Sequence, residues 1–429
     1  MIQLRIIKVF FLKRDFLKNI IILIAGTGFS QLLTVGFSPL LTRIYSPLEF
    51  GELAFFMSAS AILSILSTGR YELAIMLPKN DKKAFNILLL ICFLAFFINV
   101  LILFSLFFCG HFLLSLFNNL ISLSILFYIP IGSFFLANFQ ALNFWFSRRK
   151  KYKAISSIRL TQSVTTIMCS LIFGILGYKA FGLITSFMIG SAMSILPLFY
   201  VIWKERNLFS IKYVFSGAKK YVSYPTVMMT TAFMDTFAMQ SPVFFITKYF
   251  SSFVVGAYSL AFRIVTAPVG LISGAIAQVY FQKITSMVNG SQSSIYPTII
   301  KTAKVLLIIS LALFLPFVGF GRHIFGFIFG VNWVDAGEYV EIISIAMMVR
   351  FVVSPLSSVF ISTSYLKVAA SWQTLYFFTT IALFFIGRNL EIKKLLSFYV
   401  VHEVILYILY FSLMVFVSKK FDNRILCVD

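Results

Sequence analysis

The chain consists of long apolar stretches that alternate with short polar connections. A stretch of about 20 apolar residues can span a bilayer as a helix. The stretches are continuous and lack the strict apolar and polar alternation of membrane barrel strands, so they favour helices. The twelve stretches cover residues 19–41, 51–69, 86–109, 120–143, 158–178, 181–203, 222–247, 254–278, 302–321, 339–363, 368–387 and 395–417.

These stretches divide the chain into two halves. We therefore expect an all-α integral membrane protein of twelve transmembrane helices in two six-helix bundles, with both termini in the cytoplasm. The basic first segment is not followed by a short apolar core and a small-residue cleavage site, so we interpret it as a retained lead. The expected parts are a cytoplasmic lead (1–18), an N-terminal bundle (19–203), a cytoplasmic linker (204–221), a C-terminal bundle (222–417) and a cytoplasmic tail (418–429).

Composition excludes a water-soluble globule. Of the 429 residues, 60% are hydrophobic and 12% are charged. A soluble domain carries about twice that share of charge. Such a domain would also have too little interior for the 53 phenylalanines of this chain. Lipid is therefore the solvent for much of the surface.

The net charge of +22 could indicate a nucleic-acid partner, but topology explains it. With both termini in the cytoplasm, 27 Lys and Arg residues fall on the cytoplasmic side and 7 on the opposite side. This asymmetry is what the positive-inside rule requires. We therefore expect no nucleic acid among the partners.

A short motif recurs in both halves. Residues 42–46 (Thr-Arg-Ile-Tyr-Ser) precede Gly51, and residues 247–251 (Thr-Lys-Tyr-Phe-Ser) precede Gly256 at the same spacing, 205 positions later. Repeats of six helices each are parallel, and transporters of this type place the substrate path between the halves. The alternative is that short connections between membrane helices favour such residues in any case.

Four charged residues lie well inside the apolar stretches of the second half. Asp235, Arg263, Arg350 and Glu403 lie about 12 to 18 Å from the outer ends of their helices, at 1.5 Å per residue. Charges at this depth are costly and usually face a cavity or a partner. We assign Arg263 and Arg350 to substrate binding, and Asp235 and Glu403 to ion coupling or pairing. A neutral structural pair between Asp235 and Arg263 is the alternative.

The first half contains uncharged polar groups at depth, and we add Gln31 to the substrate-binding residues. Hydrogen bonds between packed helices are the alternative interpretation. The sequence contains no phosphate-binding loop, no zinc-protease motif and no paired cysteines. We therefore expect no catalytic residue, no metal site and no cofactor.

Two segments of the first half carry a resemblance to a known family. They are residues 38–54 (SPLLTRIYSPLEFGELA) and residues 69–75 (GRYELAI), the latter followed by Leu77-Pro78-Lys79. Together with the basic run at residues 147–153, they resemble polysaccharide biosynthesis proteins, the Wzx-type O-antigen flippases of the multidrug/oligosaccharidyl-lipid/polysaccharide exporter superfamily. The specific matches cover about the first 160 residues.

This resemblance implies two bundles around a central cavity in the bacterial inner membrane. The implied substrate is an undecaprenyl-diphosphate-linked oligosaccharide, moved from the cytoplasmic to the periplasmic leaflet by alternating access. Other polysaccharide assembly proteins are implied partners. Arg263 occupies a plausible place for a cavity-lining cation. Arg70 and Glu72 match the family pattern at the inner end of the second helix, where they gate or brace the bundle. We add Arg70 to the substrate-binding residues and Glu72 to the residues for ion coupling or pairing.

Two other functions remain open. A cation-coupled drug or metabolite exporter of the same superfamily would use Asp235 or Glu403 as its proton or sodium site. A membrane polysaccharide polymerase is the alternative from the enzyme class. It is disfavoured because the longest outer loop, about residues 322–338, is small.

Overall fold

The protein is all-helical. The structure, a computed structural model, describes residues 26–118, 120–290 and 294–426. Within these ranges no strand occurs, which confirms the all-α prediction. The predicted lead (1–18) lies outside the described residues, as do residues 19–25 of the first apolar stretch.

Contacts between helices divide the chain into two compact units. Unit 1 comprises the described parts of Met1–Tyr45 and Glu52–Phe233, and unit 2 comprises those of Ser46–Gly51 and Met234–Asp429. The first turn of α2 therefore clusters with unit 2, and the rest of α2 with unit 1. The boundaries that the sequence predicts for the linker and the tail remain predictions.

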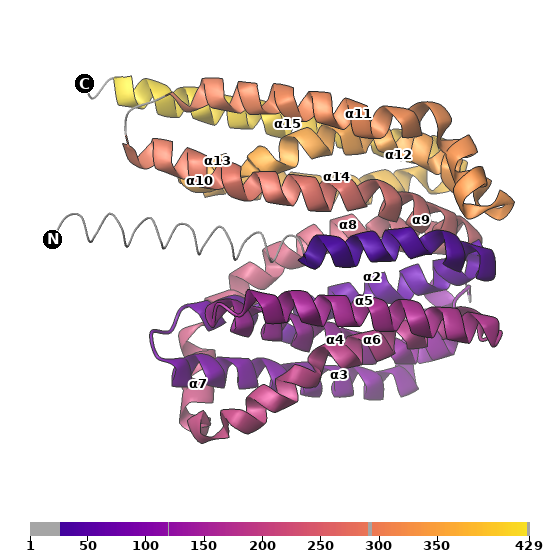
Figure 1. Ribbon diagram of the computed structural model, residues 1–429, viewed down its shortest axis with the longest axis horizontal. Coiled ribbons are helices and arrows are strands. Elements are labelled where there is room, and N and C mark those ends of the chain that lie inside the picture. The colour runs from indigo at the N-terminus through magenta and orange to yellow at the C-terminus, as the bar shows by residue number, and fades with distance from the viewer. Residues whose placement is uncertain (1–25, 119, 291–293, 427–429) are drawn as a thin grey trace. The chain divides into compact units, whose positions relative to one another are not determined.

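Unit 1 is a bundle in which neighbouring membrane helices pack side by side (Figure 1). Its core includes the fully buried rings of Phe85 and Trp145, whose centroids lie 5.9 Å apart. The predicted linker contains a short helix, α7, which packs against α3. After the helix at residues 26–44, the elements are α2 (Pro47–Thr68), η1 (Tyr71–Met76), α3 (Asp81–Leu116), α4 (Leu123–Arg148), α5 (Tyr152–Ile175), α6 (Lys179–Lys204), η2 (Arg206–Leu208), α7 (Ile211–Lys220) and η3 (Tyr224–Met228).

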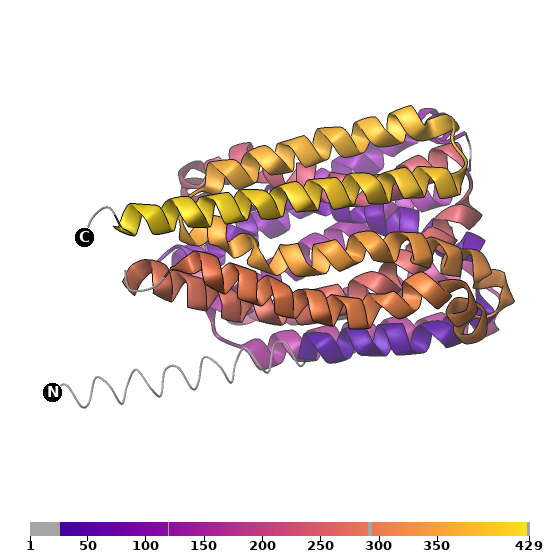
Figure 2. The ribbon, with the colours of Figure 1, turned by 90° about the horizontal axis from the view of Figure 1, so that it is seen from above.

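Unit 2 is organised around α12, which packs against α9, α11 and α15. The last two long helices, α14 and α15, lie beside each other (Figure 2). Helix α15 continues through most of the predicted tail. The elements are α8 (Met229–Tyr249), α9 (Ser252–Pro268), η4 (Val269–Ser273), α10 (Gly274–Gly290), α11 (Ile295–Phe329), η5 (Val331–Trp333), α12 (Val334–Val353), η6 (Ser354–Ser357), α13 (Ser358–Ser362), α14 (Leu366–Ile386), η7 (Gly387–Asn389) and α15 (Ile392–Leu426).

Ten helical segments of the described chain are long and apolar enough to cross a membrane. Each coincides with one of the twelve predicted stretches. The first predicted helix is described only from residue 26. The second predicted stretch that is not among the ten segments is residues 222–247, which contains helix α8. Polar side chains of α8, including Asp235 and Gln240, lower its hydropathy. The polar character of α8 is expected for a helix whose side chains do not all face lipid.

Prolines explain two irregular turns within the membrane helices. Segment η3 contains Pro225, and segment η4 follows Pro268 directly. Both segments are single wide turns of π-helix. Proline has no N–H and its ring clashes with the preceding turn, so the local helix must widen or bend. The eighth predicted stretch is therefore three consecutive pieces, α9, η4 and α10.

The two glycines of the internal repeat meet in one helix crossing of unit 2. A Cβ on Gly51 would lie 1.8 Å from the carbonyl oxygen of Ser252, and a Cβ on Gly256 would lie 1.7 Å from that of Pro47. Pro47 and Ser252 are 205 positions apart, as the two glycines are. The contact is therefore reciprocal, as expected where equivalent turns of two repeats pack against each other. Only glycine permits this approach, because the obstructing atoms are backbone.

We expect the substitution Gly256→Ala to destabilise the protein by about 1–3 kcal/mol, because α2 and α9 must separate to admit the methyl group. Thermal unfolding of the purified protein measures this effect. Gly36→Ala is the matched control, since a Cβ at Gly36 meets nothing within 4 Å. Equal melting temperatures for the two variants would contradict this prediction and show that the two helices separate at little cost in stability.

Candidate functional site

The buried charges of unit 2 gather around Glu403 on α15. This side chain is fully buried, and its Oε1 accepts a 2.6 Å hydrogen bond from the hydroxyl of Tyr376 on α14. Its second oxygen, Oε2, has no hydrogen bond of good geometry among the described residues, although the Tyr399 hydroxyl also acts on this carboxylate as a hydrogen-bond donor. A buried carboxylate of this kind is costly unless a positive charge stabilises it.

Arg350 on α12 supplies that positive charge. It interacts electrostatically with Glu403 without a direct salt bridge between the two in the described part of the chain. Its Cζ lies 5.8 Å from the centroid of the Tyr407 ring, and its Nη2 lies 3.5 Å from Sδ of Met239. The guanidinium therefore rests on an aromatic face and a thioether.

The structure places three of the four predicted intramembrane charges in one group. Asp235 on α8 interacts electrostatically with Tyr407, the same ring that contacts Arg350. Arg263 on α9 is half-buried. The roles predicted for all four remain predictions.

Arg70 and Glu72 form an ion pair where α2 ends in unit 1. Arg70 Nη1 lies 3.2 Å from Glu72 Oε1, and Glu72 is fully buried. Gly69 and Arg70 both have positive φ, at 54° and 58°, and this left-handed pair of residues stops the helix. The ion pair fixes the reversed chain against the end of α2. The choice between gating and bracing, and the substrate-binding and ion-coupling roles predicted for the two residues, remain predictions.

Tyr71 extends this brace to α7. Its hydroxyl donates a 3.0 Å hydrogen bond to the carbonyl oxygen of Ala218. Burial raises the pKa of Tyr71 above its ordinary value, so the hydroxyl stays protonated and able to donate. The segment after α2 is thereby fixed to the helix in the predicted linker.

A polar pocket in unit 1 brings Gln31 together with α5. The pocket has a volume of about 140 Å³. The hydroxyls of Ser30 and Thr34 donate to carbonyl oxygens of their own helix, so their lone pairs can accept hydrogen bonds from a ligand. The polar lining includes Ser30, Gln31, Thr34, Arg159, Gln162 and Ser163.

Arg159 is the cation of this pocket. Its Nε is buried and has no hydrogen-bond partner, and its side chain makes no ion pair among the described residues. Its Cζ lies 5.8 Å from the centroid of the Phe139 ring on α4. The guanidinium is thus held by packing while part of its hydrogen-bonding capacity is unused.

Arg159 is not among the site residues predicted from the sequence, because it falls with the predicted cytoplasmic charges at residues 148–159. The structure starts α5 at Tyr152, so Arg159 lies about 10 Å along the helix. A signal was present in the sequence. Arg159, Gln162 and Ser163 have the i, i+3, i+4 spacing of one helix face.

This arrangement of groups can bind an anion that also carries hydroxyls. A guanidinium binds phosphate oxygens through charge-assisted hydrogen bonds, and amides and hydroxyls suit sugar hydroxyl groups. The pocket contains no carboxylate that would repel an anion. In the described part of the chain, no group of three or more His, Cys, Asp or Glu residues is placed to hold a metal ion.

Comparison with known proteins identifies the family. The model of a family described as polysaccharide biosynthesis protein matches residues 40–338. The teichuronic acid biosynthesis protein TuaB of Bacillus subtilis (strain 168) is 21% identical over 260 residues, which are 59% of this chain and 50% of that protein. The chain therefore spans about half the length of this curated relative.

Solved structures show the same fold. The lipid II flippase MurJ in an inward closed conformation matches with a TM-score of 0.72 and 16% identity, covering 95% of this chain and 91% of that one. An inward-facing multidrug resistance MATE family transporter of the MOP superfamily matches with a TM-score of 0.69 and 14% identity, covering 92% and 96% of the two chains.

The predicted resemblance and the predicted fold of twelve membrane helices in two bundles are both confirmed. The protein is a multi-pass membrane protein with the architecture of transporters and flippases. The chain belongs to the family of polysaccharide biosynthesis proteins.

Proposed function

We propose that this protein is a flippase for an undecaprenyl-diphosphate-linked saccharide, such as an O-antigen repeat unit. It moves the headgroup from the cytoplasmic to the periplasmic leaflet of the bacterial inner membrane by alternating access. The family and the fold support a transporter of this kind. The substrate, the direction and the membrane are the parts that this proposal adds.

The observation that carries the proposal is the unpaired guanidinium of Arg159 in a polar pocket of membrane helices. A cation kept for stability would be paired with a carboxylate, as Arg149 is with Glu205 at 3.0 Å. Arg159 instead keeps an unused donor beside the amide of Gln31. A diphosphate would use the donor, and the sugar attached to it would use the surrounding hydroxyls.

The physical task of such a protein is to lower a desolvation barrier. An ionised diphosphate in hydrocarbon without partners would cost many kcal/mol, because its hydration is lost. Donors fixed on the helices replace part of that hydration, and the polyprenyl tail stays in the bilayer. No covalent bond forms or breaks. Arg263 would supply a further cation, whereas Arg70 is already paired with Glu72.

The cluster of Arg350, Glu403 and Asp235 favours a second candidate, a cation-coupled exporter of the same superfamily. Buried carboxylates, such as that of Glu403, are suited to bind a proton or a sodium ion. The two candidates are compatible, because an ion gradient could drive the flippase. They differ in the substrate.

Deletion of the gene distinguishes the candidate functions. Loss of a flippase is expected to leave lipid-linked single repeat units on the cytoplasmic leaflet and to remove the surface polysaccharide. Loss of a polymerase would instead leave a surface that displays one repeat unit per anchor. If the deletion strain makes unchanged polysaccharide and becomes more sensitive to drugs, the flippase assignment is wrong and the protein is a drug exporter. Mass spectrometry of extracted lipids and surface glycans provides the measurement.

A further inference from the structure

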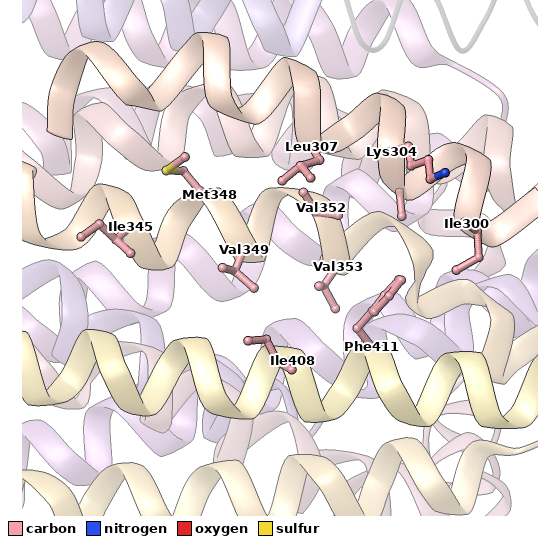
Figure 3. A pocket seen from close by; sticks show the side chains of 11 residues that line it. Ile300, Lys304, Leu307, Ile345, Met348, Val349, Val352, Val353, Ile408 and Phe411 are labelled. Carbon is pink, nitrogen blue, oxygen red and sulfur yellow. The ribbon is translucent and has the colours of Figure 1, made fainter. Parts of the chain in front are cut away.

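Unit 2 has an apolar groove between α11, α12 and α15. Its volume is about 450 Å³, and ten of its eleven lining residues are apolar. Lys304 is the exception. It lies with Ile300 toward one end of the groove, while Ile345 and Met348 lie toward the other (Figure 3). The groove is therefore an apolar channel with a single positive charge near one end.

The groove follows from the residues on three helix faces. Ile345, Val349 and Val352 lie at helical spacing on α12, and Ile408 and Phe411 at similar spacing on α15. Branched side chains are short and stiff, so they cannot extend to fill the space between the helices. An empty apolar space loses dispersion contacts on one side. In a bilayer the chain of a lipid can restore those contacts.

A further lysine lies at the end of unit 2 where α11 begins and α15 ends. The carboxylate of Asp422 on α15 accepts hydrogen bonds from the backbone N–H of Ile295 and Tyr296, at 2.8 and 2.9 Å. This contact places the start of α11 beside the end of α15. Lys419, three residues before Asp422 on α15, has its Nζ 4.8 Å from the centroid of the Tyr296 ring. This end of unit 2 therefore carries lysines from two helices.

Lys304 itself is exposed and makes no ion pair among the described residues. It lies within the first third of α11, near the edge of the predicted membrane segment at residues 302–321. A lysine there extends its ammonium toward the headgroups. Clusters of basic residues at this level attract anionic lipids.

We propose that this groove is a binding site for an anionic glycerophospholipid, with one acyl chain along the groove and the phosphate on Lys304. A phospholipid fits better than the saccharide-carrying lipid. The lining offers one cation and no hydroxyl, amide or carboxylate side chain that would recognise sugars. The pocket of Arg159 and Gln31 has those groups instead. This inference does not depend on the proposed transport substrate.

The bound lipid would stabilise the helices that carry the buried charges. Val349 in the groove directly precedes Arg350 on α12, and Ile408 directly follows Tyr407 on α15. An acyl chain between these helices fixes their spacing from a helix face next to the one that carries the Arg350 and Tyr407 contact. The lipid therefore acts as a structural ligand of unit 2.

Thermal unfolding and native mass spectrometry of the purified full-length protein test the site. We expect phosphatidylglycerol to raise the melting temperature more than phosphatidylcholine with the same acyl chains. Lys304→Gln is expected to weaken the binding of phosphatidylglycerol about fivefold, the effect of one basic residue. Val352→Phe fills the groove and is expected to weaken the binding of both lipids. Lys420→Gln, at the same end but outside the lining, is the matched control.

Two results would overturn the proposal. One is an equal response of the wild-type protein to both phospholipids, and the other is a full preference for phosphatidylglycerol in the Lys304→Gln variant. Undecaprenyl phosphate is the third ligand tested. If it displaces phosphatidylglycerol at equal concentration, the groove belongs to the polyprenyl carrier and the phospholipid assignment is wrong. If Val352→Phe does not fold, the Lys304→Gln comparison still decides.

Discussion

Replacing Arg159 with Met is expected to reduce saccharide export by at least about tenfold while the protein still folds. A charge-assisted hydrogen bond contributes about 1.5–3 kcal/mol, which corresponds to about a ten- to hundredfold change in binding. Methionine retains much of the side-chain volume in contact with Phe139, so the packing of α4 and α5 survives. The measurement is the amount of surface polysaccharide in a deletion strain that expresses each variant at matched membrane levels.

The conservative variant Arg159→Lys is expected to recover part of the export, because it restores the charge without the planar fork of donors. Lys153→Ala is the matched control, since Lys153 is an exposed cation on the same helix. Full export by the Arg159→Met variant would contradict the assignment of Arg159 to phosphate binding. If Lys153→Ala retains export and Arg159→Met loses it, the loss is due to the pocket and not to the removal of a basic charge in general.

Removal of Arg350 is expected to have the largest effect on stability. Arg350→Met leaves Glu403 fully buried without its cation, and breaking a buried charge pair in this way costs about 3–5 kcal/mol. The hydrogen bonds from the hydroxyls of Tyr376 and Tyr399 cannot compensate, because neutral donors do not replace the lost positive charge. Thermal unfolding of the purified variant in detergent measures the loss.

The double variant Arg350→Met, Glu403→Gln provides the control. It removes both charges, so we expect it to be more stable than Arg350→Met alone, with a coupling free energy of about 0.5–3 kcal/mol. Additive losses would contradict an electrostatic link between the two residues. Glu403→Gln alone also tests ion coupling, because a coupling carboxylate is required for export that depends on an ion gradient, whereas a structural one is not.

The positions of the membrane helices were largely predictable from the sequence. An unsatisfied backbone group in hydrocarbon costs several kcal/mol, so an apolar stretch of about 20 residues must become a helix. The ends were less predictable. Helix α3 begins at Asp81, with Asn80 as its cap, five residues before the predicted stretch. Polar caps and interfacial turns extend helices beyond the apolar core, and hydropathy does not report them.

The candidate sites were predictable only in part. Gln31 lies in the polar pocket, but the cation beside it, Arg159, was assigned to a cytoplasmic connection. The sequence also could not show that Glu403 and Tyr407 would both lie near Arg350. Residues 53 positions apart meet only through the rotation and the packing of α12 and α15. Side-chain volumes across the bundle determine that rotation.

The sequence by itself determined a helical membrane protein with a repeated half, because the energetics of lipid and backbone act on each segment separately. The pairing of Gly51 with Gly256 was visible only as a spacing. The tertiary structure decided that the turns of these two glycines pack together, that Arg159 lines a pocket and that Lys304 lies at one end of an apolar groove. Those features depend on which helix faces meet, and packing between residues distant in the sequence determines that.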